Sequence, residues 1–129
     1  MVVVHTGDVF NGGTTANVSM WLVGSSSNSG KLELCESCAV EQKGDLFDSG
    51  ATDRFEVAIS DLGQLQKMRI MTDDSGMFSS WFLERIEVWA IDRPKEQWSF
   101  TARRWLKKTD DETLPEIEVD VDPPNGGDL

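Results

Sequence analysis

The sequence predicts an all-β protein, an antiparallel β-sandwich of roughly eight short strands. Apolar and polar residues alternate in one segment after another, and turn-forming residues separate these segments about every ten positions. No segment keeps apolar residues at the i, i+3, i+4 spacing of a helix for three turns. Both observations favour paired strands over helices throughout the chain.

The first half of the chain contains three expected strands, at residues 2–6, 16–23 and 32–34. The second of these places Val18, Met20 and Leu22 on one face, which is the pattern of a half-buried strand. Residues 24–30 are Ser, Asn and Gly and predict a turn.

The second half continues the alternation. The strand expected at 54–59 has the clearest pattern, with Phe55, Val57 and Ile59 facing inward. Further strands are expected at 65–71, 81–91, 97–102 and 114–121. Residues 123–127 read Pro-Pro-Asn-Gly-Gly and do not suit a packed element. We therefore expect one domain over 1–121 and a flexible tail over 122–129.

Length and charge restrict the function. A chain of 129 residues is long enough for one domain with a core. The net charge of −11 argues against nucleic acid and against simple attraction to anionic lipid. A bound divalent cation would reverse that charge locally. Nothing approaches 18 consecutive apolar residues, and the N-terminus does not have the pattern of a signal peptide.

Cys35 and Cys38 form a single Cys-x-x-Cys motif. A zinc site lacks partners, because the only histidine is His5 and no second cysteine pair exists. A redox motif is typical of a helix in a βαβ unit, which the pattern does not predict. We expect two free thiols on a strand or loop, in a reducing compartment.

Residues 72–78 combine two features that rarely meet in an ordinary loop. Asp73 and Asp74 lie in a turn sequence, and the large apolar residues Met77 and Phe78 follow directly. Paired carboxylates suit a hard cation, and exposed apolar tips suit a membrane or a protein partner. The loop is therefore the first candidate for a functional site.

Six short motifs occur in an order that resembles the PLAT/LH2 (lipoxygenase homology) domain family. They are Thr6-Gly7-Asp8, Gly13-Thr14-Thr15-Ala16-Asn17-Val18, the stretch Leu46-Phe47-Asp48-Ser49-Gly50-Ala51-Thr52-Asp53-Arg54-Phe55, Asp61-Leu62-Gly63, Trp81-Phe82-Leu83 and Arg104-Trp105-Leu106. They extend over almost the whole chain. Within the family, the chain looks most like the domains of lipoxygenase homology domain-containing proteins and of polycystins.

The resemblance implies a sandwich of two four-stranded antiparallel sheets, related in shape to C2 domains. It implies a non-catalytic, monomeric module of a larger multidomain protein. Such modules target their parents to membranes or to protein partners, often with calcium, so we expect a cytoplasmic, peripheral-membrane location. The alternative is a scaffolding module that binds a protein and neither lipid nor calcium.

The resemblance also implies calcium ligands from three loops. The ligand set would be Gly13, Thr14, Asp45, Leu46, Asp48, Asp73 and Asp74. This chain has Thr15 where many relatives have Asp, which removes one charge. The alternative is that these Asp residues are turn formers. If the carboxylates converge, they repel one another in the metal-free protein.

The surface-contact residues expected from the sequence are Phe10, Met77, Phe78 and Trp105. Burying one such side chain contributes about 1.5–3 kcal/mol, so two or three suffice for reversible docking. For Phe78, the alternative is that the ring folds back onto the core. Catalysis is not expected, because His5 is the only histidine and Ser25, Ser26 and Ser27 lie in a turn.

Overall fold

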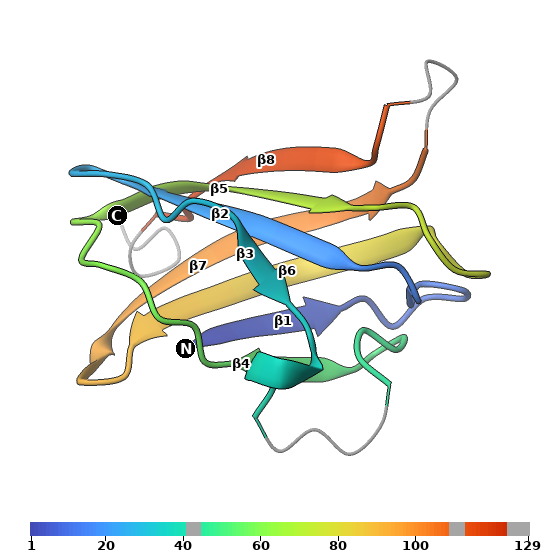
Figure 1. Cartoon of the computed structure of the whole chain (residues 1–129), viewed down its shortest axis with the longest axis horizontal. Coiled ribbons are helices and arrows are strands. Elements are labelled where there is room, and N and C mark those ends of the chain that lie inside the picture. Colours follow the sequence, from blue (N-terminus) through green and yellow to red (C-terminus); the bar gives the residue numbers. More distant parts are fainter. Residues whose placement is uncertain (41–44, 109–112, 124–129) are drawn as a thin grey trace.

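The computed structural model describes residues 1–40, 45–108 and 113–123 and contains two four-stranded sheets packed face to face (Figure 1). The first sheet has the strand order β4-β1-β6-β7, and the second has the order β3-β2-β5-β8. The strands are β1 (Val2–Thr6), β2 (Val18–Gly24), β3 (Leu32–Leu34), β4 (Thr52–Phe55), β5 (Leu65–Thr72), β6 (Trp81–Ala90), β7 (Arg93–Leu106) and β8 (Glu116–Asp120). A short 3₁₀ turn, η1 (Glu36–Cys38), follows β3. The predicted sandwich of two four-stranded antiparallel sheets is confirmed.

The core lies between the sheets and is filled by the inward positions of the strands. Val18, Met20 and Leu22 of β2 are fully buried, as their alternation predicts. Their antiparallel partners in β5 include Met68 and Ile70, which are also fully buried. Every second side chain along these strands therefore contributes to one apolar layer.

The strand expected at 54–59 is shorter and begins earlier, as β4. Phe55 is its last residue and pairs with Val2, the first residue of β1. Residues after Phe55 have no partner left in β1, so the chain leaves this edge of the sheet. Val57 is half-buried and Ile59 is 38% exposed, so the expectation that both face inward with Phe55 is wrong for Ile59.

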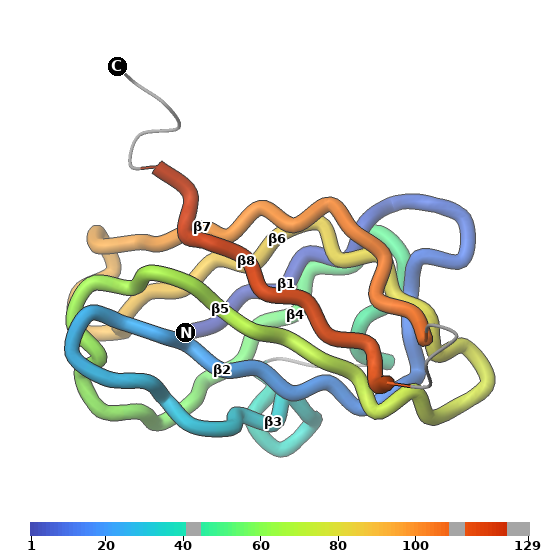
Figure 2. Tube along the Cα trace, turned by 90° about the horizontal axis from the view of Figure 1, so that it is seen from above, coloured from blue at the N-terminus to red at the C-terminus, as the bar shows by residue number. Residues whose placement is uncertain are grey.

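Both ends of the described chain lie at one end of the sandwich (Figure 2). The Met1 amine donates to the carbonyl oxygen of Trp89 at 2.8 Å. Asp122 donates its backbone N–H to Ser99 O at 2.7 Å, and its carboxylate accepts from Thr101. The loops that follow β1 and β5 lie at the opposite end. Of the expected tail, residues 124–129 are outside the described residues.

None of the helical structure in the described ranges is long and apolar enough to cross a membrane.

Candidate functional site

Three loops meet at the end of the sandwich opposite to Met1: residues 7–17, 45–51 and 73–80, together called the loop end. The backbone N–H of Thr14 donates to Phe47 O at 3.1 Å, which joins the first loop to the second. The backbone N–H of Thr15 donates to Phe78 O at 2.8 Å, which joins the first loop to the third. The buried Thr14 hydroxyl lies 3.0 Å from the carbonyl oxygens of both Phe78 and Ser79. The first loop therefore holds the other two together.

Gly13 lets the first two loops approach closely. A Cβ atom at this position would lie 2.8 Å from both Phe47 O and Ser49 N, closer than side chains approach backbone. A residue without a side chain is needed here. The backbone carbonyls of Gly13 and Thr14, which are predicted calcium ligands, thus lie beside the loop that carries Asp45 and Asp48.

Asp53 holds the second loop through a hydrogen bond to its backbone. Its buried carboxylate accepts from the Phe47 backbone N–H at 2.8 Å. Phe47 has φ of 61°, a left-handed conformation that is uncommon outside glycine. Its buried ring stacks on Phe55 at 5.8 Å and lies 5.2 Å from Trp81. Burial raises the pKa of Asp53. Because this carboxyl bonds the Phe47 backbone, its role is to hold the second loop in place.

Asp73 is already engaged by four donors. Its carboxylate accepts the backbone N–H of Asn17 at 3.0 Å and the Asn17 side-chain amide at 2.7 Å. It also accepts the Ser75 hydroxyl at 2.6 Å and the Ser75 backbone N–H at 3.0 Å. The hydrogen bonds from Ser75 and Asn17 hold the pKa of Asp73 far below its usual range. A cation at Asp73 would have to compete with these bonds.

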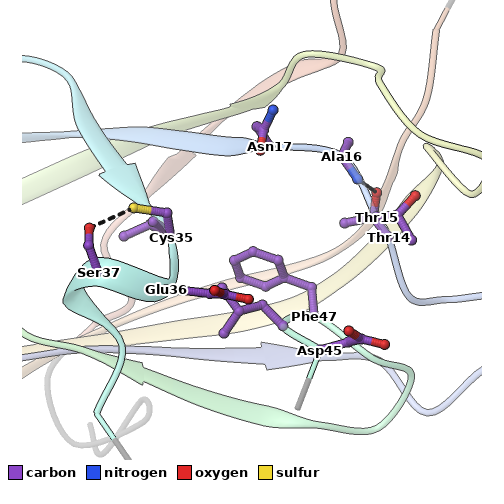
Figure 3. A pocket seen from close by; sticks show the side chains of 11 residues that line it. Thr14, Thr15, Ala16, Asn17, Cys35, Glu36, Ser37, Asp45 and Phe47 are labelled. Carbon is purple, nitrogen blue, oxygen red and sulfur yellow. Dashed lines mark hydrogen bonds between the residues drawn. The ribbon is translucent and has the colours of Figure 1, made fainter. Parts of the chain in front are cut away.

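Asp45 lines a cavity of about 500 Å³ beside the loop end (Figure 3). The walls come from three segments, residues 14–17, 34–37 and 45–47. Glu36 contributes a second carboxylate, and Thr14 and Thr15 also line the cavity, although their hydroxyls contact the carbonyl oxygen of Phe78. Carboxylates are oxygen ligands of the kind that calcium prefers. Asp45 is the one predicted carboxylate that lines this cavity.

The other predicted ligands lie outside the cavity or reach it through the backbone. The Leu46 side chain is half-buried against the core, so only the backbone carbonyl of Leu46 could serve as a calcium ligand. Asp48 is exposed, and Asp74 is half-buried with φ of 57°. In the described part of the chain, no three side chains of His, Cys, Asp or Glu are grouped so that they could hold a metal ion. The structure thus brings the three loops together without gathering three of their carboxylates.

Large apolar side chains are exposed at the loop end. Phe10 is 90% exposed, Met77 is 87% exposed and Phe78 is 58% exposed, so Phe78 does not fold into the core. Trp105 is 39% exposed and lies edge-on to Phe82, with ring centroids 5.3 Å apart. All four residues predicted to contact a surface are therefore exposed at the same end.

Three residues of this end were not singled out from the sequence. Leu114 is an exposed apolar residue in the segment before β8. Glu36 reaches the cavity only because η1 turns the chain after β3. Asn17 lies opposite Asp73 because Val18 pairs with Thr72 in the β2–β5 ladder. Had the strand register been assigned, the Asn17–Asp73 pair would have followed from it.

Comparison with known proteins identifies the family. The model of the PLAT/LH2 domain matches residues 1–117. The chain belongs to the PLAT/LH2 family. The resemblance carried by the six motifs is thereby confirmed, and so are the two kinds of relatives named with it.

Relatives of this PLAT/LH2 domain are much longer proteins. Lipoxygenase homology domain-containing protein 1 of Homo sapiens is 35% identical over 109 residues, which is 84% of this chain. Polycystin family receptor for egg jelly of Mus musculus is 32% identical over 107 residues, or 82% of this chain. In both cases the match covers 5% of the relative's length. The domain thus occurs in these relatives as a small part of a multidomain protein.

Solved structures share the fold. A coral 8R-lipoxygenase, described as activated by calcium through a C2-like domain, superposes with a TM-score of 0.76 at 21% identity. The superposition covers 94% of this chain and 16% of that one. A calcium-dependent 11R-lipoxygenase gives a TM-score of 0.68 at 22% identity, covering 93% of this chain and 16% of the other. At these identities the likeness establishes the C2-like sandwich.

Proposed function

We propose that this PLAT/LH2 domain is a non-catalytic module that brings its parent protein to a membrane surface through the loop end. The exposure of Phe10, Met77 and Phe78 at one end of the sandwich carries the proposal. Met1 and Asp122 lie at the opposite end, so chain flanking them would leave the loop end free to approach a surface. A cytoplasmic, peripheral location suits a domain whose two cysteines are unpaired.

Calcium assists this docking in our proposal. The chain carries a net charge of −11, so an anionic membrane repels it unless a cation intervenes. Asp45, with backbone carbonyls of Gly13, Thr14 and Leu46, would supply the first ligands, and Asp48 and Asp74 lie on neighbouring loops. Asp73 joins this set only if its bonds to Asn17 and Ser75 open. The family fold is shared with lipoxygenases described as calcium-regulated, which makes calcium the first cation to test.

Sedimentation with liposomes tests the docking surface. The Met77→Ala/Phe78→Ala double variant removes two exposed apolar tips, each able to contribute about 1.5–3 kcal/mol when buried. We expect it to bind at least about tenfold more weakly, since tenfold corresponds to about 1.4 kcal/mol.

The matched control is Ile59→Ala/Ile91→Ala, which removes exposed apolar side chains away from the loop end. We expect this control to pellet with vesicles as the wild type does. Equal pelleting of the wild type and the loop-end variant would contradict the proposal.

A protein-interaction module is the second candidate. One observation favours it, because the carboxylate of Asp73 is already satisfied by hydrogen bonds. The family resemblance adds that this chain has Thr15 at a position where an acidic residue is expected. Under this alternative, calorimetry detects no calcium binding and the wild type does not pellet with vesicles of any composition. The same apolar tips would then contact a protein.

A further inference from the structure

The two cysteines of the chain lie at the ends of one tight turn. Cys35 precedes η1 and Cys38 is its last residue, and the Cys38 backbone N–H donates to Cys35 O at 3.1 Å. A turn closed by this bond keeps the two Cα atoms within about 7 Å. Cys35 has an extended backbone, and Cys38 Sγ lies 3.4 Å from Cys35 O, so the Cys38 side chain is directed toward Cys35. A disulfide requires Cα atoms about 4.4–6.8 Å apart, so this backbone is suited to one.

The two thiols have different surroundings. Cys35 is exposed at the cavity wall, and its Sγ lies 3.1 Å from the Ser37 hydroxyl oxygen (Figure 3). Cys38 is half-buried against the core, and its Sγ donates to Glu33 O at 3.3 Å and to Cys35 O at 3.4 Å. The exposed sulfur is thus accessible to a reagent, and the inner sulfur is held beside it.

The two thiols also differ in pKa, as their surroundings require. The hydrogen bond with the Ser37 hydroxyl lowers the pKa of the Cys35 thiol, which favours the nucleophilic thiolate. Burial raises the pKa of Cys38, which favours the protonated form of this thiol. Since the sequence has two cysteines in all, neither has another intramolecular partner.

We propose that Cys35 and Cys38 are a reversible redox site, with Cys35 the peroxide-reactive thiol and Cys38 the resolving thiol. The Cys35 thiolate attacks one oxygen of a hydroperoxide; an S–O bond forms, the O–O bond breaks, and the leaving oxygen takes up a proton. Cys38 sulfur then attacks Cys35 sulfur; the S–S bond forms, the S–O bond breaks, and the hydroxyl leaves as water with the Cys38 proton. Two electrons pass from the sulfurs to the peroxide.

The sequence-based expectation is two free thiols on a strand or loop, and in the structure both thiols are free and lie at the two ends of one 3₁₀ turn. The pattern does not predict the 3₁₀ turn, which the structure places between β3 and the second loop. Since Cys35, Glu36 and Ser37 line the cavity that contains Asp45, oxidation would fix one wall of that cavity.

Peroxide treatment followed by thiol alkylation and intact-mass analysis tests the site. The folded wild-type protein is held in a chelator, which removes soft metals, and is treated with hydrogen peroxide. We expect both thiols to become unavailable to alkylation, without added oxygen and without covalent dimers, and dithiothreitol to restore both. In Cys38→Ser, which lacks the resolving thiol, we expect a sulfenic acid at Cys35 that dimedone traps.

Two results would overturn the proposal. One is that both wild-type thiols stay alkylatable after the peroxide treatment. The other is that Cys38 in Cys35→Ser reacts with peroxide as fast as Cys35 does in Cys38→Ser, which removes the assigned division of roles. The wild-type measurement needs no variant, so it decides the first point even if a substitution disturbs folding.

Discussion

Asn17 holds the carboxylate of Asp73 with two hydrogen bonds, one from its backbone N–H at 3.0 Å and one from its side-chain amide at 2.7 Å. The backbone N–H of Asp73 in turn donates to Asn17 O at 3.1 Å. This reciprocal pair joins the loop after β1 to the loop after β5 where the β2–β5 ladder ends. It therefore sets the base of the loop that presents Met77 and Phe78.

The first prediction concerns the energy of this pair. Asp73→Ala and Asn17→Ala should each lower the free energy of unfolding by about 1 kcal/mol. This is less than the ~1.5–3 kcal/mol of hydrogen bonds to charged groups, because the carboxylate is exposed and screened by solvent. Urea denaturation of both single variants and the double variant measures the coupling. Additive effects would show that the two side chains do not act together.

The second prediction is the pH dependence of the same contribution. Hydrogen bonds in the folded state, led by that from Ser75, lower the pKa of Asp73 from its ordinary 3.8. A group with a lowered folded-state pKa stabilises the protein above its unfolded-state pKa, and this contribution is lost as the pH falls. The stability gap between the wild type and Asp73→Ala should be full at neutral pH and shrink below about pH 4. Denaturant titrations from neutral to acid pH measure it; a gap that widens in acid would contradict the assignment.

The sequence predicts the sandwich well because several strands, such as β8, alternate apolar and polar residues. Val18, Met20 and Leu22 are buried as expected, since alternation reports burial directly. The prediction that Ile59 faces inward is wrong because alternation does not tell where the partner strand ends. The pairing of β4 with β1 ends at the Phe55–Val2 pair. The 3₁₀ turn after Cys35 is not predicted either, because a single turn is too short to give a periodic pattern in the sequence.

The candidate site is predictable only in part. Exposure of Phe10, Met77 and Phe78 follows from apolar residues inside turn sequences. The use of Asp73 as a hydrogen-bond acceptor depends on Asn17, 56 positions away in the chain. Predicting such a pairing requires knowledge of the strand register. Residue type alone therefore cannot distinguish an Asp that binds calcium from an Asp that holds two loops together by hydrogen bonds.

The third prediction concerns how tightly the loop end is packed. Gly76 has φ of +82°, and a Cβ there would lie 2.2 Å from the Thr15 hydroxyl oxygen. Gly30 has φ of +71° with nothing within 4 Å, so Gly30→Ala is a matched control that introduces only backbone strain. That strain costs about 1–2 kcal/mol. We expect Gly76→Ala to cost more than Gly30→Ala in thermal melts, and equal costs would show that Thr15 yields without penalty.

The fourth prediction concerns calcium. A cation that binds only the folded state adds RT ln(1 + [L]/Kd), about 2.7 kcal/mol at a hundredfold excess over Kd. Millimolar calcium should raise the Tm, and magnesium should raise it less because it requires a tighter octahedron. Because Asp45 lines the cavity and Asp73 is engaged by Asn17, Asp45→Asn should reduce the calcium shift more than Asp73→Asn.

The control for the calcium measurement is Asp92→Asn, which removes the same charge from an exposed carboxylate in the β6–β7 turn. It should leave the calcium shift unchanged. Thr15→Asp, which adds a carboxylate at the cavity wall, should enlarge the shift. A Tm that does not respond to millimolar calcium in the wild type would leave Asp45 an ordinary loop residue.

The most direct test of membrane docking places a fluorescent label on the loop end itself. In a Cys35→Ser/Cys38→Ser background, an environment-sensitive fluorophore is attached through Met77→Cys, and separately through Ile91→Cys in the β6–β7 turn. On adding vesicles with calcium, we predict a blue shift of the emission at position 77 and an unchanged spectrum at position 91. A protein that binds the vesicles while the probe at 77 stays in water, or while the probe at 91 shifts instead, would contradict the claim that the loop end is the membrane-contact surface.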